Sequence, residues 1–303
     1  MDDTALQQLH ELARAAAHPG SGGEGGDCRC QAGVLADRAD GTVVRHGRLV
    51  LKAHGPGGDG GELAARVRVA GLGGVEGVLL APVPAPRTSR GPEDRPLSVW
   101  PYGVPVDPED PDAAPWEAAG RLLARLHQVP APTGTPPMRA PVKVALAVER
   151  MRRAAPGHPA APTVLRAWAT IPDRVPGGAA LCHGDFHLGQ LVRLGPPGAD
   201  ARWRLIDVDD LGVGDPAWDL ARPAAWYAAG LLEPGVWSRF LTAYETAGGP
   251  ATRPDPWLRL DLPARALTVQ TAALALAKST TERRPLDEVE QVMIDICARI
   301  GSV

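Results

Sequence analysis

Residues 181–221 constrain this chain more than any other segment, because two apolar runs in it end abruptly in acidic residues. The first run leads into the sequence HGDFHLGQ, which contains Asp185. The second run, residues 203–206, leads into a cluster of three aspartates: Asp207, Asp209 and Asp210. A carboxylate at the end of a buried strand costs free energy unless it is paired or bound to a cation. The pattern therefore predicts a site where several carboxylates meet a cation.

Other residue types in the chain fit phosphate chemistry. Gln190 adds an amide oxygen five residues after Asp185. Carboxylate and amide oxygens suit Mg²⁺, which takes few protein ligands and shares its remaining positions with phosphate. Lys52 is the only lysine in the first 140 residues. A hard cation, a free carboxylate and a lysine are the minimal equipment for phosphoryl transfer, in which catalysis is mainly positioning and charge neutralisation.

The order of these elements resembles the aminoglycoside phosphotransferase-like family of small-molecule kinases, which is of the choline kinase type and distantly related to protein kinases. That family has a His-Gly-Asp loop, an amide five residues later, a strand ending in Ile-Asp, and then Gly-Asp-Pro and Asp-Leu-Ala. This chain carries, in order, His183-Gly184-Asp185, Gln190, Ile206-Asp207, Gly214-Asp215-Pro216 and Asp219-Leu220-Ala221. With the N-terminal part included, the resemblance covers about residues 30–300.

The resemblance implies roles for the residues of the catalytic half. Asp185 would orient the attacking hydroxyl or accept its proton, and His183 would support the loop. Gln190 and Asp207 would hold Mg²⁺ against the phosphates of ATP. Three further residues would brace this loop or lie near the substrate: Asp215, Asp219 and His187.

The resemblance also implies roles in the first third of the chain. Lys52, on the third strand, would reach the α- and β-phosphates of ATP, and Glu62 would pair with it from a helix. Residues 97–103, which include Trp100 and Tyr102, would be the hinge between two lobes and would offer backbone groups to adenine.

Two features depart from the family pattern. The amide is usually Asn, whereas here it is Gln190, and HGDFHLGQ is similar to the glucosamine kinase and maltokinase branch. The downstream sequence IDVDDLGVGDPAWDLA is closer to the antibiotic kinases, so the motif does not decide the substrate. The turn over residues 38–41 also lacks the several glycines that cover the phosphates in protein kinases.

The first third of the chain reads as a sheet. Residues 33–37, 42–46 and 48–54 alternate with the period of a strand and are separated by turn residues. Residues 75–83 and 96–103 add two further strands, and residues 62–70 have helical spacing. A helix over residues 4–17 and a glycine-rich linker over 18–27 come before them.

The remainder of the chain is mainly helical. Apolar residues at three- and four-residue spacing predict a helix from residue 116 that ends before Pro130. Further helices are predicted at 143–154, 160–170, 235–247, 257–278 and 286–300. We therefore expect an α+β, two-lobe protein-kinase-like fold: residues 1–103 form a nucleotide-binding lobe with a five-stranded antiparallel sheet and one helix, and residues 104–303 form a mostly helical catalytic lobe. ATP and Mg²⁺ would lie in the cleft between the lobes.

Composition excludes several other classes of function. The net charge of −3 gives no basic field for nucleic acid. No apolar run is long enough for a membrane span, and the chain opens without a secretory leader. The four cysteines are too scattered for a disulfide framework, and their spacing matches no zinc motif. We therefore predict a cytoplasmic enzyme without membrane or nucleic-acid partners.

The sequence thus predicts an ATP- and Mg²⁺-dependent phosphotransferase that acts on a hydroxyl of an amino sugar, a sugar or an aminoglycoside, the last implying antibiotic resistance. Two alternatives stay open: a kinase for another natural product, such as a macrolide or a nucleoside antibiotic, and a non-catalytic nucleotide-binding pseudokinase. A protein kinase is disfavoured, because the interval between Asp207 and Asp219 is too short for a peptide-docking loop.

Overall fold

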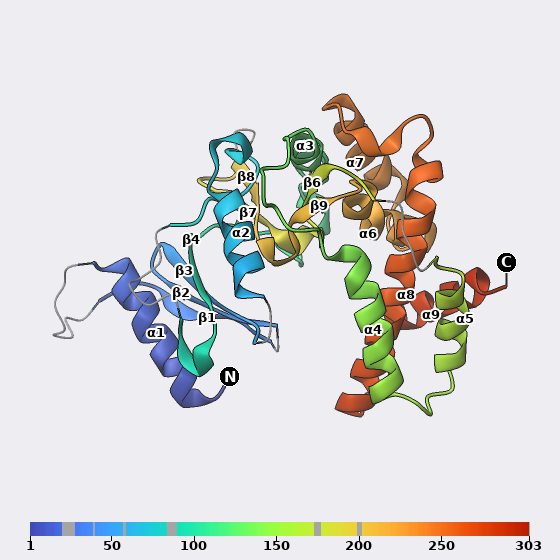
Figure 1. The fold of residues 1–303 in the computed structure, drawn as a ribbon, viewed down its shortest axis with the longest axis horizontal. Coiled ribbons are helices and arrows are strands. Elements are labelled where there is room, and N and C mark those ends of the chain that lie inside the picture. Colours follow the sequence, from blue (N-terminus) through green and yellow to red (C-terminus); the bar gives the residue numbers. More distant parts are fainter. Residues whose placement is uncertain are drawn as a thin grey trace. The chain divides into compact units, whose positions relative to one another are not determined.

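The computed structural model describes residues 1–19, 28–38, 40–56, 59–83, 90–172, 177–198 and 202–302. Most of the predicted glycine-rich linker lies outside these residues, as does part of the turn at 38–41. The chain divides into two compact units, one made of Met1–Val106 and Leu191–Asp209 and the other of Asp107–Gln190 and Asp210–Val303 (Figure 1).

The first unit is built on a four-stranded antiparallel sheet in the order β1-β2-β3-β4. Its strands are β1 (Ala32–Arg38), β2 (Gly41–His46), β3 (Leu49–His54) and β4 (Leu97–Pro101). The helix α1 (Asp3–Ala17) packs on the sheet, and Leu9 and Ala13 join a core with Val44, Leu51, Ala53 and Val99. The helix begins at Asp2, whose carboxylate accepts a hydrogen bond from the Ala5 N–H at 2.8 Å.

The predicted fifth strand at residues 75–83 is wrong. The segment begins with the 3₁₀ turn Gly73–Val75 and then makes two isolated bridges, Leu79 with Leu205 and Val83 with Val99. Pro82 lies inside the segment and has no N–H for a ladder, which explains why pairing stops at single bridges. A separate three-stranded sheet contains β5 (Val104–Pro105), β7 (Leu191–Leu194) and β8 (Arg202–Leu205). The helix α2 (Gly60–Ala70) is where residues 62–70 predict it.

The second unit is mainly helical. Its helices are α3 (Trp116–His127), α4 (Ala140–Ala154), α5 (Ala161–Ala169), α6 (Ala217–Ala228), α7 (Pro234–Thr246), α8 (Pro256–Glu282) and α9 (Glu288–Ile300). A short antiparallel pair joins β6 (Ala180–Cys182) to β9 (Gly212–Gly214). The 27-residue helix α8 packs against α4, α6 and α9 and forms the centre of the unit, and α3 lies against α7 (Figure 1).

The helix α6 is absent from the elements that the sequence predicts. It carries Pro223 in its interior, and a proline there has no N–H for the helical ladder, so the segment resembles a loop in sequence. Eight of its twelve residues are nevertheless buried, so tertiary packing overrides the local preference.

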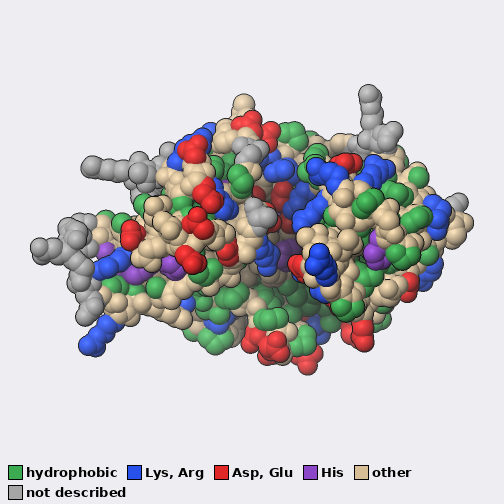
Figure 2. Space-filling model, turned by 90° about the horizontal axis from the view of Figure 1, so that it is seen from below, with side chains coloured by type: hydrophobic (Ala, Val, Ile, Leu, Met, Phe, Trp, Pro, Cys, Tyr) green, Lys and Arg blue, Asp and Glu red, His purple; other side chains and the backbone are tan. Residues whose placement is uncertain are grey.

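The surface is mixed in character. On the face shown in Figure 2, acidic, basic and apolar side chains are interspersed and no one kind covers it, in keeping with the net charge of −3. Among the described helices, none is long and apolar enough to cross a membrane.

Candidate functional site

One part of the candidate site lies on the first unit, where β3 faces the segment after β8. Leu51 and Ala53 point into the core, so alternation turns Lys52 to the other face of the sheet. There the Lys52 Nζ lies 2.7 Å from the Asp207 Oδ1 and 3.0 Å from the Asp209 Oδ2. The structure thus joins two residues far apart in sequence, Lys52 and Asp207, that the resemblance assigned to ATP and its metal.

A chain of hydrogen bonds extends this cluster along the sheet. His54 follows Lys52 on the same face, and its Nδ1 lies 3.0 Å from Asp209. Its Nε2 lies 2.7 Å from the Ser98 hydroxyl, which accepts a hydrogen bond from the Trp100 Nε1–H at 2.7 Å. The side chains of this chain can all form their hydrogen bonds at once. His54 then donates from Nδ1 to Asp209 and accepts at Nε2 from the Ser98 hydroxyl. Trp100, expected near adenine, is therefore tied to the sheet through its ring nitrogen.

Lys52 and Asp209 both stay ionised in this cluster, because each is stabilised by the groups around it. Burial by itself would lower the pKa of Lys52, but Asp207 and Asp209 outweigh it and raise that pKa above its ordinary value. Burial would likewise raise the pKa of Asp209, but the hydrogen bond from His54 and the Lys52 charge hold that pKa well below its usual range. Asp207 has a φ of 62°, a left-handed conformation that non-glycine residues seldom adopt, and such backbone strain is concentrated at functional sites.

Two nucleotide-binding predictions meet different partners. Glu62 does not pair with Lys52; its carboxylate lies 3.0 Å from Arg66, one helical turn further along α2. Asp207 and Asp209 occupy the place expected for Glu62 beside the lysine. Tyr102 has the Arg45 guanidinium 3.5 Å from its ring centre, so one face of the ring is covered by a cation.

The other part of the site lies on the second unit, at the loop that follows β6. Gly184 has a φ of 84°, and a Cβ there would collide with the carbonyl oxygen of Asp210. Only glycine can adopt this left-handed backbone and also leave the space that a Cβ would fill, which explains the middle residue of His183-Gly184-Asp185. The loop therefore turns sharply and presents Asp185.

Asp219 braces this loop from beneath. Its carboxylate accepts hydrogen bonds from the backbone N–H groups of His183 at 2.6 Å and Gly184 at 2.7 Å, and its Oδ2 lies 2.9 Å from the Nε2 of His127. The other ring nitrogen of His127 lies 2.8 Å from the Tyr244 hydroxyl. Asp219 is 0% exposed and bonds to the loop backbone, which fits the expected bracing role, while a role near the substrate stays a prediction. Burial would raise the pKa of Asp219, but the hydrogen bonds lower it.

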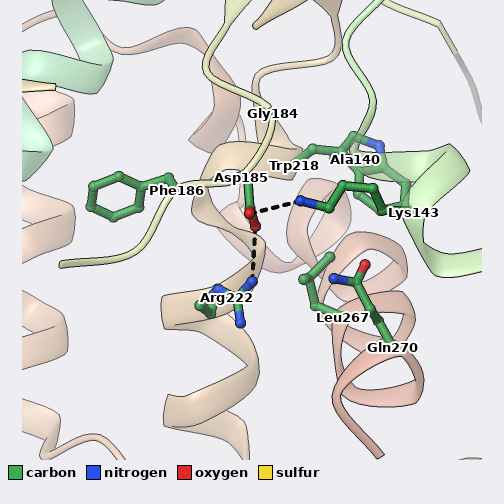
Figure 3. Close-up of a pocket in the computed structure, with 9 residues that line it drawn as sticks. All are labelled: Ala140, Lys143, Gly184, Asp185, Phe186, Trp218, Arg222, Leu267 and Gln270. Carbon is green, nitrogen blue, oxygen red and sulfur yellow. Dashed lines mark hydrogen bonds and ion pairs between the residues drawn. The ribbon is translucent and has the colours of Figure 1, made fainter. Parts of the chain in front are cut away.

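Two cations hold the Asp185 carboxylate (Figure 3). The Lys143 Nζ on α4 lies 2.8 Å from Oδ2, and an Arg222 guanidinium nitrogen on α6 lies 2.9 Å from Oδ1. Lys143 also lies 2.7 Å from Asp210. Burial by itself would raise the pKa of Asp185, but the two cations outweigh it and hold that pKa well below its usual range. Asp185 is therefore ionised at neutral pH.

A small pocket opens beside Asp185 (Figure 3). Gln270 and Leu267 approach it from α8, whereas the Phe186 ring points away from the carboxylate. The full lining is Ala140, Lys143, Gly184, Asp185, Phe186, Trp218, Arg222, Leu267 and Gln270. Sequence reasoning missed Lys143 and Arg222, although the chain has only three lysines and Arg222 follows Asp219 by three residues, less than one helical turn.

The remaining predicted residues lie near the loop. Gln190 ends the 3₁₀ turn Leu188–Gln190, is buried, and donates its backbone N–H to the His187 carbonyl at 2.9 Å. His187 accepts a hydrogen bond from the Gly189 N–H at 3.1 Å and so shapes the same turn. Asp215 accepts a hydrogen bond from the Ala217 N–H at 3.0 Å, at the start of α6, and pairs with Arg259 at 2.8 Å. The proposed roles of these residues in metal or substrate binding remain predictions.

Comparison with known proteins gives this arrangement a family. The model of the phosphotransferase enzyme family matches residues 36–265. The fold is that of a choline/ethanolamine kinase family protein from Mesorhizobium loti (TM-score 0.57, 20% identity, covering 96% of this chain and 92% of that one). It is also that of a thermostable mutant of an aminoglycoside phosphotransferase (TM-score 0.59, 14% identity, 90% and 95% covered). A spectinomycin phosphotransferase in complex with ADP and spectinomycin is similar as well (TM-score 0.53, 13% identity, 90% and 92% covered).

The chain belongs to the phosphotransferase enzyme family. It is a small-molecule phosphotransferase with the protein-kinase-like fold that the sequence predicts, apart from the number of strands. The search of curated proteins returned no match to the chain.

Proposed function

We propose that this enzyme transfers the γ-phosphoryl group of ATP to a hydroxyl group of a sugar or amino sugar, with Asp185 as the catalytic carboxylate. The observation that carries the proposal is the position of Asp185, which is ionised, held by Lys143 and Arg222, and part of the lining of a pocket. In the reaction the acceptor oxygen bonds to the γ-phosphorus, the bond to the β-phosphate oxygen breaks, and ADP leaves. Asp185 orients the acceptor hydroxyl and receives its proton.

The low pKa of Asp185 fits this chemistry. A carboxylate with a depressed pKa is a weak base and takes the proton late, after the phosphoryl group has begun to move. Phosphoryl transfer tolerates late proton transfer, because its transition state is loose and depends mainly on positioning and charge neutralisation. Lys143 and Arg222 thus favour orientation of the hydroxyl over its deprotonation.

The resemblance to the family assigns several residues to the nucleotide and its metal. Asp207 and Gln190 supply oxygen atoms of the kind that Mg²⁺ prefers, and the Asp207 carboxylate is 36% exposed, so it can accept a cation. When bound, Mg²⁺ would neutralise the phosphates of ATP. Lys52 would contact the α- and β-phosphates, while Glu62 pairs with Arg66 on α2. Backbone groups around Trp100 and Tyr102 would face adenine.

The charge of the pocket supports a neutral or singly charged acceptor. Its lining contains two cations, Lys143 and Arg222, and one carboxylate, Asp185. A polycationic aminoglycoside needs several carboxylates to balance its amines, whereas a sugar needs polar groups and an aromatic face. The Gln270 amide and the Trp218 ring are groups of that second kind, and both line the pocket with little of either residue exposed, at 5% and 4%. Asp215 and His187 remain candidates for contacts at its edge.

The proposal is tested by ADP release with ATP and Mg²⁺. The acceptors would be glucosamine, maltose, aminoglycosides, macrolides and nucleoside antibiotics, at equal concentration. We expect stimulation by a sugar or amino sugar; stimulation by aminoglycosides alone would overturn the assignment of the acceptor.

The four free cysteines of the described residues support a reducing, cytoplasmic setting for the reaction.

Asp185→Asn tests the catalytic assignment. We expect it to lower kcat by about 10²–10⁴-fold, because the amide cannot accept the proton. ATP binding, measured by calorimetry, should be retained. Asp295→Asn on the exposed surface of α9 is the matched control and should turn over like the wild type. Undiminished turnover in Asp185→Asn would refute the mechanism.

A further inference from the structure

Four side chains that the proposed reaction does not use lie close together at the C-terminal end of α1. His18 follows the helix directly, Cys28 and Cys30 precede β1, and His46 is the last residue of β2. Their nitrogen and sulfur atoms all lie within 4.8 Å of one another. We propose that His18, Cys28, Cys30 and His46 form a structural Zn²⁺ site.

The distances between these atoms are those of a zinc tetrahedron. His18 Nε2 lies 3.1 Å from Cys28 Sγ and 3.6 Å from Cys30 Sγ, and His46 Nε2 lies 3.4 Å from Cys28 Sγ. Zinc bonds of about 2.3 Å to sulfur and about 2.0–2.1 Å to nitrogen place these ligand atoms about 3.5 Å apart in a tetrahedron. The three N–S distances therefore fit ligation of one Zn²⁺ ion, and the remaining pairs of atoms lie within 4.8 Å.

The ligand types and their orientation fit the same ion. Two thiolates balance the charge of Zn²⁺, and two imidazoles complete the Cys₂His₂ set that structural sites use. The His18 and His46 rings are nearly perpendicular, at 88°, with centroids 5.3 Å apart, so both present Nε2 without stacking. The Cys30 N–H lies 3.3 Å from Cys28 Sγ, a backbone donor of the kind that supports metal thiolates.

The protein would fill all four positions, so the site is of the closed, structural type and has no place for a substrate. It would tie the C-terminal end of α1 to the β2–β3 turn. Gly47, in that turn, has a φ of 61°, and a Cβ there would lie 3.3 Å from Cys30 Sγ. The turn therefore packs closely against Cys30. The metal would attach α1 to the sheet at this end, in addition to the core contacts of Leu9 and Ala13.

A second cluster, His127, Cys182 and Asp219, has similar spacing. It is fully buried, and the Asp219 carboxylate already accepts two backbone hydrogen bonds and pairs with His127. That cluster is explained by the support of the catalytic loop. The first cluster has no such role in the loop, and its zinc site would not take part in the proposed kinase reaction.

The test uses the full-length chain, purified under reducing conditions without added chelator. Elemental analysis should find one zinc per chain in the wild type and less than about a tenth of that in a Cys28→Ser/Cys30→Ser variant. Because loss of groups that merely support ligands costs 10–100-fold in metal affinity, removal of a ligand should weaken Zn²⁺ binding by more than about a hundred-fold. Cys297→Ala, a buried cysteine in α9, is the matched control and should retain the metal.

Cobalt identifies the ligands. The metal-free wild type, titrated with Co²⁺, should show the intense visible bands of a tetrahedral ion and the near-ultraviolet bands of thiolate ligation. His18→Ala should weaken these bands, whereas His10→Ala, on the same end of the chain, should leave them unchanged. A chelator should lower the Tm of the wild type and not that of the double cysteine variant.

Three results would overturn the proposal. One is a wild type that binds no Zn²⁺ in competition with a chromophoric chelator. Another is a cobalt spectrum without thiolate bands. The last is zinc affinity retained in the single variants Cys30→Ser and His18→Ala, which serve if the double variant does not fold.

Discussion

Asp185 carries its negative charge between two cations on different helices. Lys143 and Arg222 each contact a separate oxygen, so the carboxylate is fixed in orientation as well as charge. Neither residue belongs to the motif from which the site was predicted. A catalytic carboxylate with a low pKa is suited to holding a hydroxyl in line with phosphorus rather than to removing its proton early.

Lys143→Met should move the pH dependence of the reaction. Loss of the cation removes a contact that lowers the pKa of Asp185, so that pKa should rise toward its ordinary value. The ionised form would then be lost at higher pH, and the acidic limb of kcat/KM against pH should shift upward. Lys278→Met, an exposed lysine on α8, is the control. Identical acidic limbs in Lys143→Met and the wild type would contradict the assignment.

Gly184→Ala should damage the loop itself. A left-handed residue with a side chain costs about 1–2 kcal/mol, and the Cβ would also collide with Asp210, so we expect a larger loss of unfolding free energy together with loss of turnover. Gly157→Ala is the comparison, because a Cβ there meets nothing within 4 Å. Equal stability of the two variants in urea would show that the loop relaxes.

At the scale of elements, the two parts of the site are held in different ways. On the first unit, strand alternation places Lys52 and His54 on one face of β3, and hydrogen bonds link them to Asp209 and to Ser98 on β4. On the second unit, the catalytic loop has little regular structure and depends on Asp219, which comes from α6. The helix that the sequence did not predict therefore supplies the main support of the predicted loop.

Asp219→Asn should separate support from chemistry. The amide keeps the shape but weakens hydrogen bonds to a charged acceptor, each worth about 1.5–3 kcal/mol, so stability should fall by at least about that amount. We expect kcat to fall more than the KM for the acceptor rises, because Asp219 does not touch the pocket. Asp295→Asn serves as the control. A change confined to KM would instead indicate substrate contact.

At the scale of the whole molecule, ionised carboxylates control stability toward acid. The pKa values of Asp185, Asp209 and Asp219 are all lowered in the folded chain. Their stabilising contribution is complete above the unfolded pKa of about 3.9 and is lost as pH falls through the folded values, since the unfolded chain then binds more protons. Lys52 and Lys143 have raised pKa values, so their contribution is lost only at strongly alkaline pH.

Urea unfolding at pH 7 and at pH 3 should therefore give a clearly lower free energy of unfolding at acid pH. The difference should shrink in Asp219→Asn, which lacks one of the titrating groups. A free energy of unfolding that is unchanged by acid would show that the three carboxylates have ordinary pKa values in the folded state.

Much of the architecture follows from local sequence. The change from two-residue to helical periodicity predicts a sheet followed by helices, and β1, β2, β3 and β4 lie where the alternation indicates. Local order also carries the motif, so the resemblance to the family, and with it the loop that presents Asp185, could be recognised in the sequence. The periodicity of an element and the motif of the loop both depend on residues that are close together in the chain, so they can be read from the sequence.

Tertiary structure decided what depends on residues far apart in sequence. Glu62 pairs with Arg66 rather than Lys52, because the segment after β8 brings Asp207 and Asp209 to the lysine. Packing against α8 makes α6 a helix despite Pro223. The cluster of two cysteines and two histidines likewise has no motif spacing, since its members come from three separate segments. Contacts of this kind form only when the chain is folded, and a linear pattern does not record which distant side chains will meet.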